Sequence, residues 1–332
     1  MEPIVLMQHK WGLTMNIPWY LFLGSLAGGT LLVAALADLL GWRQERYQLL
    51  SRVSTYITVP IILIAGLFLT FHLGKPERGF LFPFFMKNYR SWLTIGGWII
   101  GLFAPLTIAY AAAWFFQLSR TLRIVLAVIS IPAGIMMNLY TGFLLAGAWP
   151  TPGGFWFVPL WAKEYIPVLF LLSGISTGLA ACGLAALIAG RVRWPRGSGF
   201  QGVGETAMTL SLVDIAAILF EAWWIYVLLS AFAVGTLGQK LAYKLLTSGA
   251  LWLWFWWGFV AIGLALPILA SLGELVFEKT FHRRAEWLLY AKFALVLIGG
   301  LVLRYVIVWG GDLKQPLIFP PQVWPIPPLA GG

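Results

Sequence analysis

Three ionisable residues stand inside long apolar runs, where a charge is unfavourable. Asp214 and Glu221 lie seven residues apart in one run, and Arg304 lies in the segment GGLVLRYVIVWGG. A charge at the centre of a bilayer costs about 2.5–3.5 kcal/mol on insertion scales, so such residues usually pair or serve a function. The spacing of seven places Asp214 and Glu221 on one helix face. We interpret the three as a candidate proton route; the alternative is a buried Arg304–Glu221 pair that only holds helices together.

The first apolar run, WGLTMNIPWYLFLGSLAGG, opens with polar and aromatic residues. Asn16, Trp19 and Tyr20 are spaced by three and four positions, so they share one face where a helix begins. Asn16 can donate and accept hydrogen bonds, and Trp19 offers a flat apolar surface with one N–H. Interface anchoring explains the Trp and Tyr better than the Asn. We therefore expect this helix end to line a site for a flat, amphipathic ligand.

The elements that position these residues are membrane spans. The protein has 332 residues, 60% hydrophobic and 10% charged, with a mean hydropathy of +0.85. Ordinary soluble domains carry about 25% charged residues, and about 20 apolar residues cross the hydrocarbon core of a bilayer. We predict an all-α integral membrane protein with eight transmembrane helices, over residues 18–40, 51–73, 92–117, 121–147, 163–190, 206–235, 248–275 and 286–310.

Two further features concern organisation and orientation. Residues 1–310 are expected to form the transmembrane domain, and residues 311–332, with QPLIFPPQVWPIPP, a Pro-rich interfacial tail. The loops after the first, third, fifth and seventh spans hold eleven Lys and Arg, ten of them Arg, against nine on the other side. The positive-inside rule then places those loops in the cytoplasm and both termini on the outer face of the cytoplasmic (inner) membrane. Small residues at four-residue spacing in the first span, Gly24 with Gly28 and Ser25 with Gly29, predict close helix packing.

The composition also excludes several kinds of site. The single cysteine, Cys182, rules out an iron–sulfur cluster held by this protein alone. The only histidines are His9, His72 and His282, and none of them pairs with another inside the bundle, so we predict no haem and no other metal. Neither a Walker loop nor a Gly-rich dinucleotide fingerprint is present, and the scattered basic residues do not indicate nucleic-acid binding. We therefore expect no catalysis by this protein on its own.

Four stretches, WYLFLGSLAGGTLLVAAL, FHLGKPERGFLF, NLYTGFLLAG and LRYVIVWGGD, resemble the NrfD/PsrC family of haem-free, quinone-reactive membrane subunits of polysulfide, nitrite and related reductases. The likeness spans most of the sequence. It implies a fold of two four-helix bundles and an exchangeable quinone or menaquinone near the outer face. It also implies an iron–sulfur (ferredoxin-like) partner docked there, which serves a molybdopterin-type catalytic subunit.

The resemblance also implies site residues. The quinone-binding positions it matches are Asn16, Trp19, Leu73, Gly74, Pro76 and Tyr140. Trp19 stands where relatives can carry His, and His72, beside the Leu-Gly-x-Pro segment, is the candidate to replace that imidazole.

The expected function is a quinone/quinol-binding membrane anchor of a multisubunit respiratory oxidoreductase, which passes electrons between the quinone pool and an iron–sulfur partner. Proton transfer would accompany this reaction. Two alternatives stay open. One is a proton-coupled membrane carrier, in which Asp214, Glu221 and Arg304 couple transport; the other is a purely structural membrane anchor.

Overall fold

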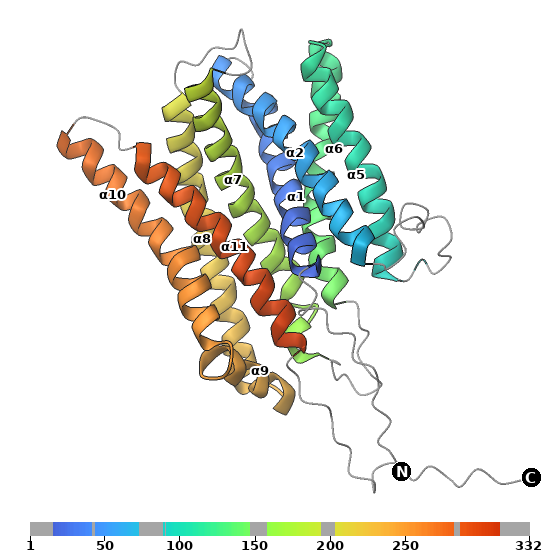
Figure 1. Cartoon of the computed structure of the whole chain (residues 1–332), viewed down its shortest axis with the longest axis vertical. Coiled ribbons are helices and arrows are strands. Elements are labelled where there is room, and N and C mark those ends of the chain that lie inside the picture. Colours follow the sequence, from blue (N-terminus) through green and yellow to red (C-terminus); the bar gives the residue numbers. More distant parts are fainter. Residues whose placement is uncertain are drawn as a thin grey trace, which may run out of the picture.

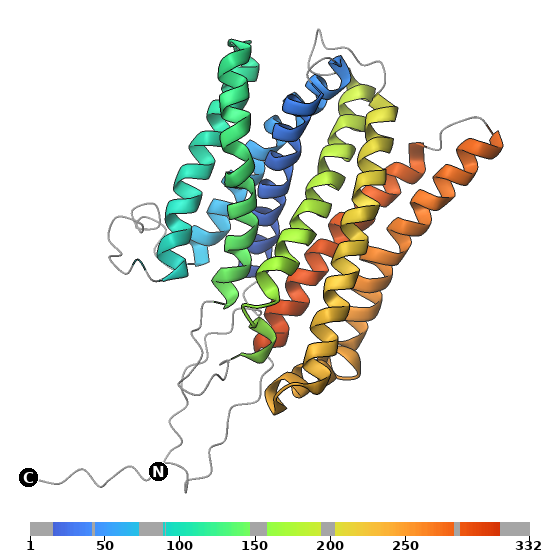
Figure 2. The ribbon, with the colours of Figure 1, turned by 180° about the vertical axis from the view of Figure 1, so that it is seen from behind.

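The computed structural model describes residues 16–41, 44–72, 89, 91–146, 158–193, 203–281 and 286–312. The side chains of residues 16, 72, 274–281, 286 and 312 are outside the described set. All regular elements in these ranges are helical, and most are long helices that lie side by side at small angles (Figures 1 and 2).

Within the described residues, eight helices are long and apolar enough to cross a membrane, which confirms the predicted count and the all-α class. They alternate in direction, so α1 begins and α11 ends at the same end of the bundle (Figure 1). We call this the terminal end. The spans are α1 (Asn16–Leu40), α2 (Glu45–His72), α5 (Trp92–Phe115), α6 (Arg120–Ala146), α7 (Ile166–Val192), α8 (Val203–Val234), the π-helical η2 (Trp254–Ala265) continued by α10 (Leu266–Phe281), and α11 (Glu286–Asp312).

Helix α2 begins six residues earlier than the predicted start at residue 51. Its first turns are stabilised by tertiary contacts. Leu49 and Leu50 are buried in a hydrophobic cluster, and Arg46 forms an ion pair with Glu205 of α8. The helix thus extends beyond the purely apolar stretch that the sequence pattern marks.

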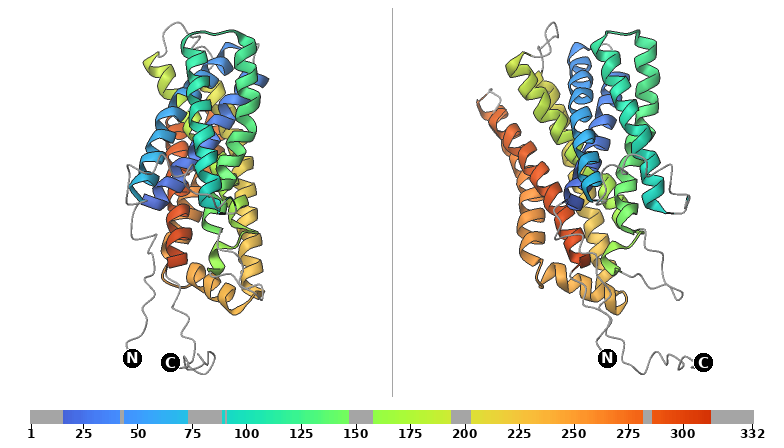
Figure 3. Two further views of the ribbon diagram at one scale, coloured as in Figure 1. Left: turned by 90° about the vertical axis from the view of Figure 1, so that its right-hand side faces the viewer. Right: turned by 45° about the vertical axis from the view of Figure 1, so that its right-hand side comes forward.

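Two short elements at the terminal end lie between the predicted spans and were not predicted. The 3₁₀ turn η1 (Pro159–Trp161) precedes α7, and α9 (Leu237–Thr247) runs across the end of the bundle rather than along it (Figures 1 and 3). Helix α9 starts with a capping box: the Thr236 hydroxyl accepts from the Gln239 backbone N–H, and the Gln239 side chain accepts from the Thr236 N–H. These reciprocal bonds allow a helix to start directly after α8.

Helices α1 and α7 are the most buried spans, and they meet through glycines. A Cβ added to Gly29 would lie 1.9 Å from the Gly174 carbonyl oxygen, and one on Gly178 would lie 2.4 Å from the Gly29 carbonyl carbon. One residue before Gly29, a Cβ on Gly28 would lie 2.5 Å from Asn138 Nδ2 of α6. The close packing predicted from the small-residue spacing is therefore confirmed.

The first four spans lie on one side of the α1–α7 contact and the last four on the other (Figure 3). One hydrophobic cluster nevertheless includes residues of both halves, such as Leu31 and Phe293. The division into two four-helix bundles stays a prediction. The boundary at residue 310 also stays a prediction, because residues 313–332 lie outside the described ranges.

Candidate functional site

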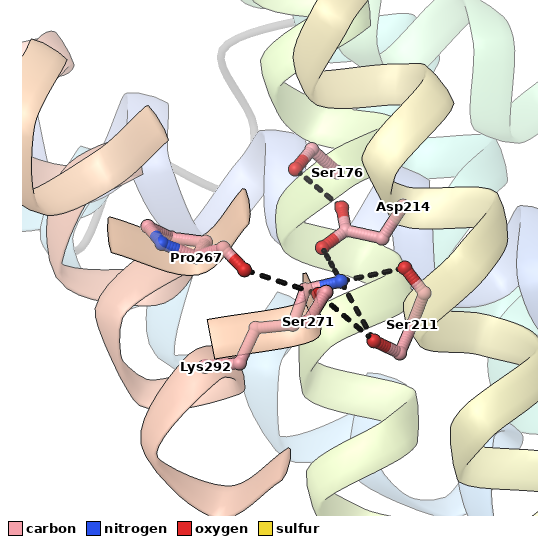
Figure 4. A network of polar contacts seen from close by, with 6 residues as sticks. All are labelled: Ser176, Ser211, Asp214, Pro267, Ser271 and Lys292. Carbon is pink, nitrogen blue, oxygen red and sulfur yellow. Dashed lines mark hydrogen bonds and ion pairs between the residues drawn. The ribbon is translucent and has the colours of Figure 1, made fainter. Parts of the chain in front are cut away.

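Asp214 of α8 lies in the interior of the second half and contacts two other helices (Figure 4). Its Oδ1 accepts a hydrogen bond from the Ser176 hydroxyl of α7 at 2.6 Å, and its Oδ2 lies 3.2 Å from Lys292 Nζ of α11. Both charged residues are completely buried. The arrangement is a buried ion pair whose two charges neutralise each other away from solvent.

Lys292 was not singled out by the sequence analysis. Its ammonium also donates to the Ser211 carbonyl at 2.6 Å and to the Ser211 hydroxyl at 2.9 Å. The Ser211 hydroxyl lies 3.2 Å from that of Ser271 in α10, which extends the network to a fourth helix (Figure 4). The signal that could have identified Lys292 is the one used for Arg304, a lone cation within the predicted span 286–310.

Arg304 and Glu221 lie closer to the terminal end of α11 and α8. Arg304 Nη1 donates to the Ser173 hydroxyl of α7 at 3.0 Å, and its guanidinium carbon lies 4.0 Å from the centre of the Phe170 ring. Glu221 is close to both Ser173 and Arg304. Among the described side chains no direct ion pair joins Glu221 to Arg304, although the two charges interact electrostatically. The proton route and the pair that only holds helices together both stay open.

Asp214 and Arg304 thus each contact a serine of α7, Ser176 and Ser173 respectively, and we call these two charges, with Glu221 and Lys292, the polar column. From Lys292 to Arg304 the column follows twelve residues of α11, about 18 Å at the rise of an α-helix. In the part nearer the terminal end, Glu221 Oε1 and Arg304 Nε are buried and lack a hydrogen-bond partner among the described residues. Buried polar groups are normally satisfied, so this part of the column suits ordered water.

Tyr140 lies at the terminal end of α6 and meets α1. Its hydroxyl accepts a hydrogen bond from the Tyr20 hydroxyl at 3.2 Å, and both side chains are fully buried. A Cβ on Gly96 of α5 would lie 1.8 Å from Tyr140 Cζ, so the tyrosine ring packs on bare backbone there. Because its oxygen accepts from Tyr20, Tyr140 keeps its own hydroxyl hydrogen for another acceptor. Tyr20, which the sequence placed at this helix end but not among the quinone-binding positions, is thus the partner of Tyr140.

Trp19 and its sequence neighbour Tyr20 contact different helices, so the prediction that both lie on one face of this helix end is wrong. Its indole stacks on Phe68 of α2, with ring centroids 6.1 Å apart and an interplanar angle of 12°. The hydroxyl of Tyr305 in α11 lies beside this indole. That hydroxyl is buried and makes no hydrogen bond of normal geometry with the described residues. Trp19 and Tyr140 therefore face different neighbours of α1, although both lie at the terminal end.

The other predicted quinone-binding residues can be placed only in part. Asn16 is the first residue of α1 and His72 the last of α2, which puts both backbones at the terminal end, while their side chains lie outside the described set. Leu73, Gly74 and Pro76 lie outside the described residues.

The geometry supplies two kinds of chemistry. At the terminal end, phenol and indole groups from α1, α6 and α11 offer hydrogen-bond donors next to flat aromatic surfaces. Along the column, carboxylates, hydroxyls and two cations place polar groups at two depths within apolar surroundings. Tyr305, which lies beside the Trp19 indole, directly follows Arg304 in α11, so the two groups share this helix.

A family model described as "Polysulphide reductase, NrfD" matches residues 4–314 of the sequence. Among curated proteins, the C subunit of the polysulfide reductase of Wolinella succinogenes is 28% identical over 318 residues, which cover 88% of the present sequence and 92% of that protein. Protein NrfD of Escherichia coli is 25% identical over 285 residues, which cover 78% of the present sequence and 82% of that protein.

Proposed function

Because the protein belongs to the polysulphide reductase NrfD family, we propose that it is the quinone-reactive membrane subunit of a multisubunit respiratory oxidoreductase. In this role it binds a quinone or quinol, such as menaquinone, at the terminal end. An iron–sulfur subunit docked on that end exchanges the electrons and serves a molybdopterin-type catalytic subunit. The long match to a polysulfide reductase subunit supports the assignment to such a complex.

The observation that carries this proposal is the Tyr140 hydroxyl, which accepts from Tyr20 and keeps its own hydrogen to donate. A quinone head is flat and has a carbonyl acceptor at each end, so it needs aromatic walls and hydrogen-bond donors. Tyr140 has a hydrogen to donate, and toward another neighbour of α1 the Tyr305 hydroxyl lies beside the flat Trp19 indole. These residues fit the chemistry of the group.

When bound, the quinone would supply reversible two-electron, two-proton chemistry. Tyr140 would donate a hydrogen bond to a carbonyl oxygen, held in direction by Tyr20 and by its packing on Gly96. Trp19 would form an apolar wall. Asn16, His72, Leu73, Gly74 and Pro76 are proposed as further contacts on the strength of the resemblance.

The test is saturable binding of a fluorescent quinol analogue, measured on the purified protein and on its complex with the partner subunits. Tyr140→Phe removes the donor but keeps the ring, and we expect it to weaken binding about tenfold, or about 1.4 kcal/mol. The matched control is Tyr226→Phe, which alters a tyrosine 69% exposed on α8 and should bind normally.

Two results would contradict the proposal. Equal binding by Tyr140→Phe and wild type would remove Tyr140 from the site. A failure of both the isolated protein and the complex to bind the analogue, with the helices intact, would favour the purely structural anchor.

We also propose that the polar column carries protons to and from the terminal end. Quinone reduction takes up two protons and quinol oxidation releases two, so the site needs a route through apolar surroundings. Glu221 would hold a proton at its carboxylate, and the buried atoms without partners at Glu221 and Arg304 support water in the route. Asp214, with Lys292, would continue the route toward the opposite end.

Glu221→Gln tests this route because it preserves shape and removes the titrating group. In the complex reconstituted into vesicles, we expect quinone turnover to fall about a hundredfold, the low end of proton-transfer contributions, with quinol-analogue binding unchanged. Glu205→Gln is the control on the same helix, since Glu205 is half-exposed and pairs with Arg46. Unchanged turnover in Glu221→Gln would exclude the route, and proton-coupled solute uptake by vesicles containing this protein alone would favour the carrier.

A further inference from the structure

Helix α9 presents an exposed stripe made of leucines and lysines. Leu237 and Leu241 are 76% and 59% exposed, and Lys240 and Lys244 are exposed beside them. Spacings of three and four put these four residues on one side of the helix. Because successive residues turn by about 100°, the two leucines occupy one edge of the stripe and the two lysines the other.

The opposite side of α9 is fixed to the bundle. Ala242 and Leu246 are buried. A Cβ on Gly238 would lie 2.6 Å from Pro159 Cγ of η1, so the two elements are in close contact. Trp161 of η1 in turn donates its indole N–H to the Ile307 carbonyl of α11 at 2.8 Å. The stripe is therefore held in one orientation relative to the spans.

The tryptophans that follow α9 in the sequence indicate how deep this helix lies in the membrane. Tryptophan collects at membrane–water interfaces, where its ring meets the headgroups. With about 16 Å of length, α9 is too short to cross the hydrocarbon and lies across the bundle end (Figure 1). Four tryptophans that begin η2 or immediately precede it are 40–62% exposed: Trp252, Trp254, Trp256 and Trp257.

We propose that α9 is an interfacial anchor that binds anionic lipid. Leu237 and Leu241 enter the boundary of the acyl chains, and Lys240 and Lys244 bind the phosphate groups of lipid headgroups. Within the described residues neither lysine forms an ion pair, and an ammonium complements a phosphate. The binding of lipid by α9 does not depend on the proposed quinone chemistry.

The depth of α9 can be measured with a nitroxide on Leu241→Cys, in a Cys182→Ala background that removes the only native cysteine. In phosphatidylglycerol–phosphatidylcholine vesicles, we expect oxygen to reach this label more readily than a water-soluble nickel chelate does. A label on Val213→Cys, at an exposed position within α8, gives the reference accessibility for a label deep in the hydrocarbon. A label at residue 241 that the nickel chelate reaches freely, or that only added partner subunits protect, would overturn the proposal.

The role of the two lysines can be tested by measuring how much anionic lipid the purified protein retains. Lys240→Gln combined with Lys244→Gln should reduce the phosphatidylglycerol bound to the purified protein, by about fivefold for each lysine, as native mass spectrometry can measure. The charge-preserving pair Lys240→Arg and Lys244→Arg should retain it, and raised salt should weaken the wild type. Equal retention by the glutamine and arginine variants would contradict the assignment of the phosphate contacts.

Discussion

At the scale of single residues, the buried pair of Asp214 and Lys292 has the clearest energetic consequence. Each charge depends on the other because neither reaches solvent, and both also bond to serines of neighbouring helices. Breaking a buried pair from one side leaves an uncompensated charge, whereas replacing both partners by apolar groups can be nearly neutral.

We predict that Lys292→Met lowers the free energy of unfolding by about 3–5 kcal/mol, because it leaves Asp214 unpaired. Asp214→Leu combined with Lys292→Met should recover most of the loss. Thermal unfolding in detergent, followed by circular dichroism, measures both variants and the Asp214→Leu single variant. If the two single losses simply add in the double variant, the residues are not energetically coupled and this account of the pair is wrong.

The sequence pattern identified some of these residues but not how they pair. Asp214 and Arg304 were found because charges in apolar runs are unfavourable. Lys292 was missed because it lies six residues into α11, where a long lysine side chain can often reach the interface. Which neighbour each charge meets depends on the rotation of every helix about its axis. Side-chain packing between helices sets that rotation, and the periodicity of a single sequence does not contain it.

At the scale of elements, the contact between α1 and α7 depends on glycines with no room for a side chain. Gly29 faces the backbone carbonyl of Gly174, which cannot move unless α7 moves as well. Membrane helices lack a hydrophobic force between them, so such close approach contributes directly to their association.

Gly29→Ala should therefore destabilise the bundle by about 1–3 kcal/mol, the usual range for an overpacked interior. Gly66→Ala is the matched control in α2, because a Cβ there would meet nothing within 4 Å. Its better helix propensity should leave stability unchanged or raise it by up to about 1 kcal/mol. Denaturation midpoints of the two variants in the same detergent give the comparison; an unaffected Gly29→Ala would show that α7 can shift.

The eight spans were predictable because each is a long apolar stretch, and hydropathy reports such stretches directly. Helix α9 was not predicted, because its eleven residues include two lysines and are too few to cross a membrane. A search for apolar stretches long enough to span the bilayer therefore passes over it. The sequence pattern did not predict the π-helical form of η2 either. That form is a change in backbone hydrogen bonding within a uniformly apolar segment, and hydropathy does not report it.

At the scale of the whole molecule, an even number of spans puts both ends of the polypeptide on one side. The family membership predicted from four short stretches is confirmed over residues 4–314, because the order and spacing of several weak motifs identify a family better than any one of them. Which side of the membrane the terminal end faces is predicted from the distribution of arginine between the two ends of the bundle.

We predict that both termini face outward from the cytoplasm, because ten arginines lie in the connections and helix ends at the opposite end. Alkaline phosphatase fused to the C-terminus should be active and green fluorescent protein fused there should be dark, while fusions in the loop after α10 should give the reverse. Active phosphatase fusions in the loop after α10 would show that the protein has the inverted orientation.

The pairing of Lys292 with α8 also constrains how the protein is made. Ser211 and Lys292 are separated by 81 residues, so α8 emerges from the ribosome well before the cation that Asp214 requires. At about 5–20 residues per second, the interval is on the order of ten seconds. During that time the two buried carboxylates of α8, Asp214 and Glu221, lack the cations of α11. We therefore expect α8 to stay beside the translocon or a chaperone until synthesis of α11 completes the pair.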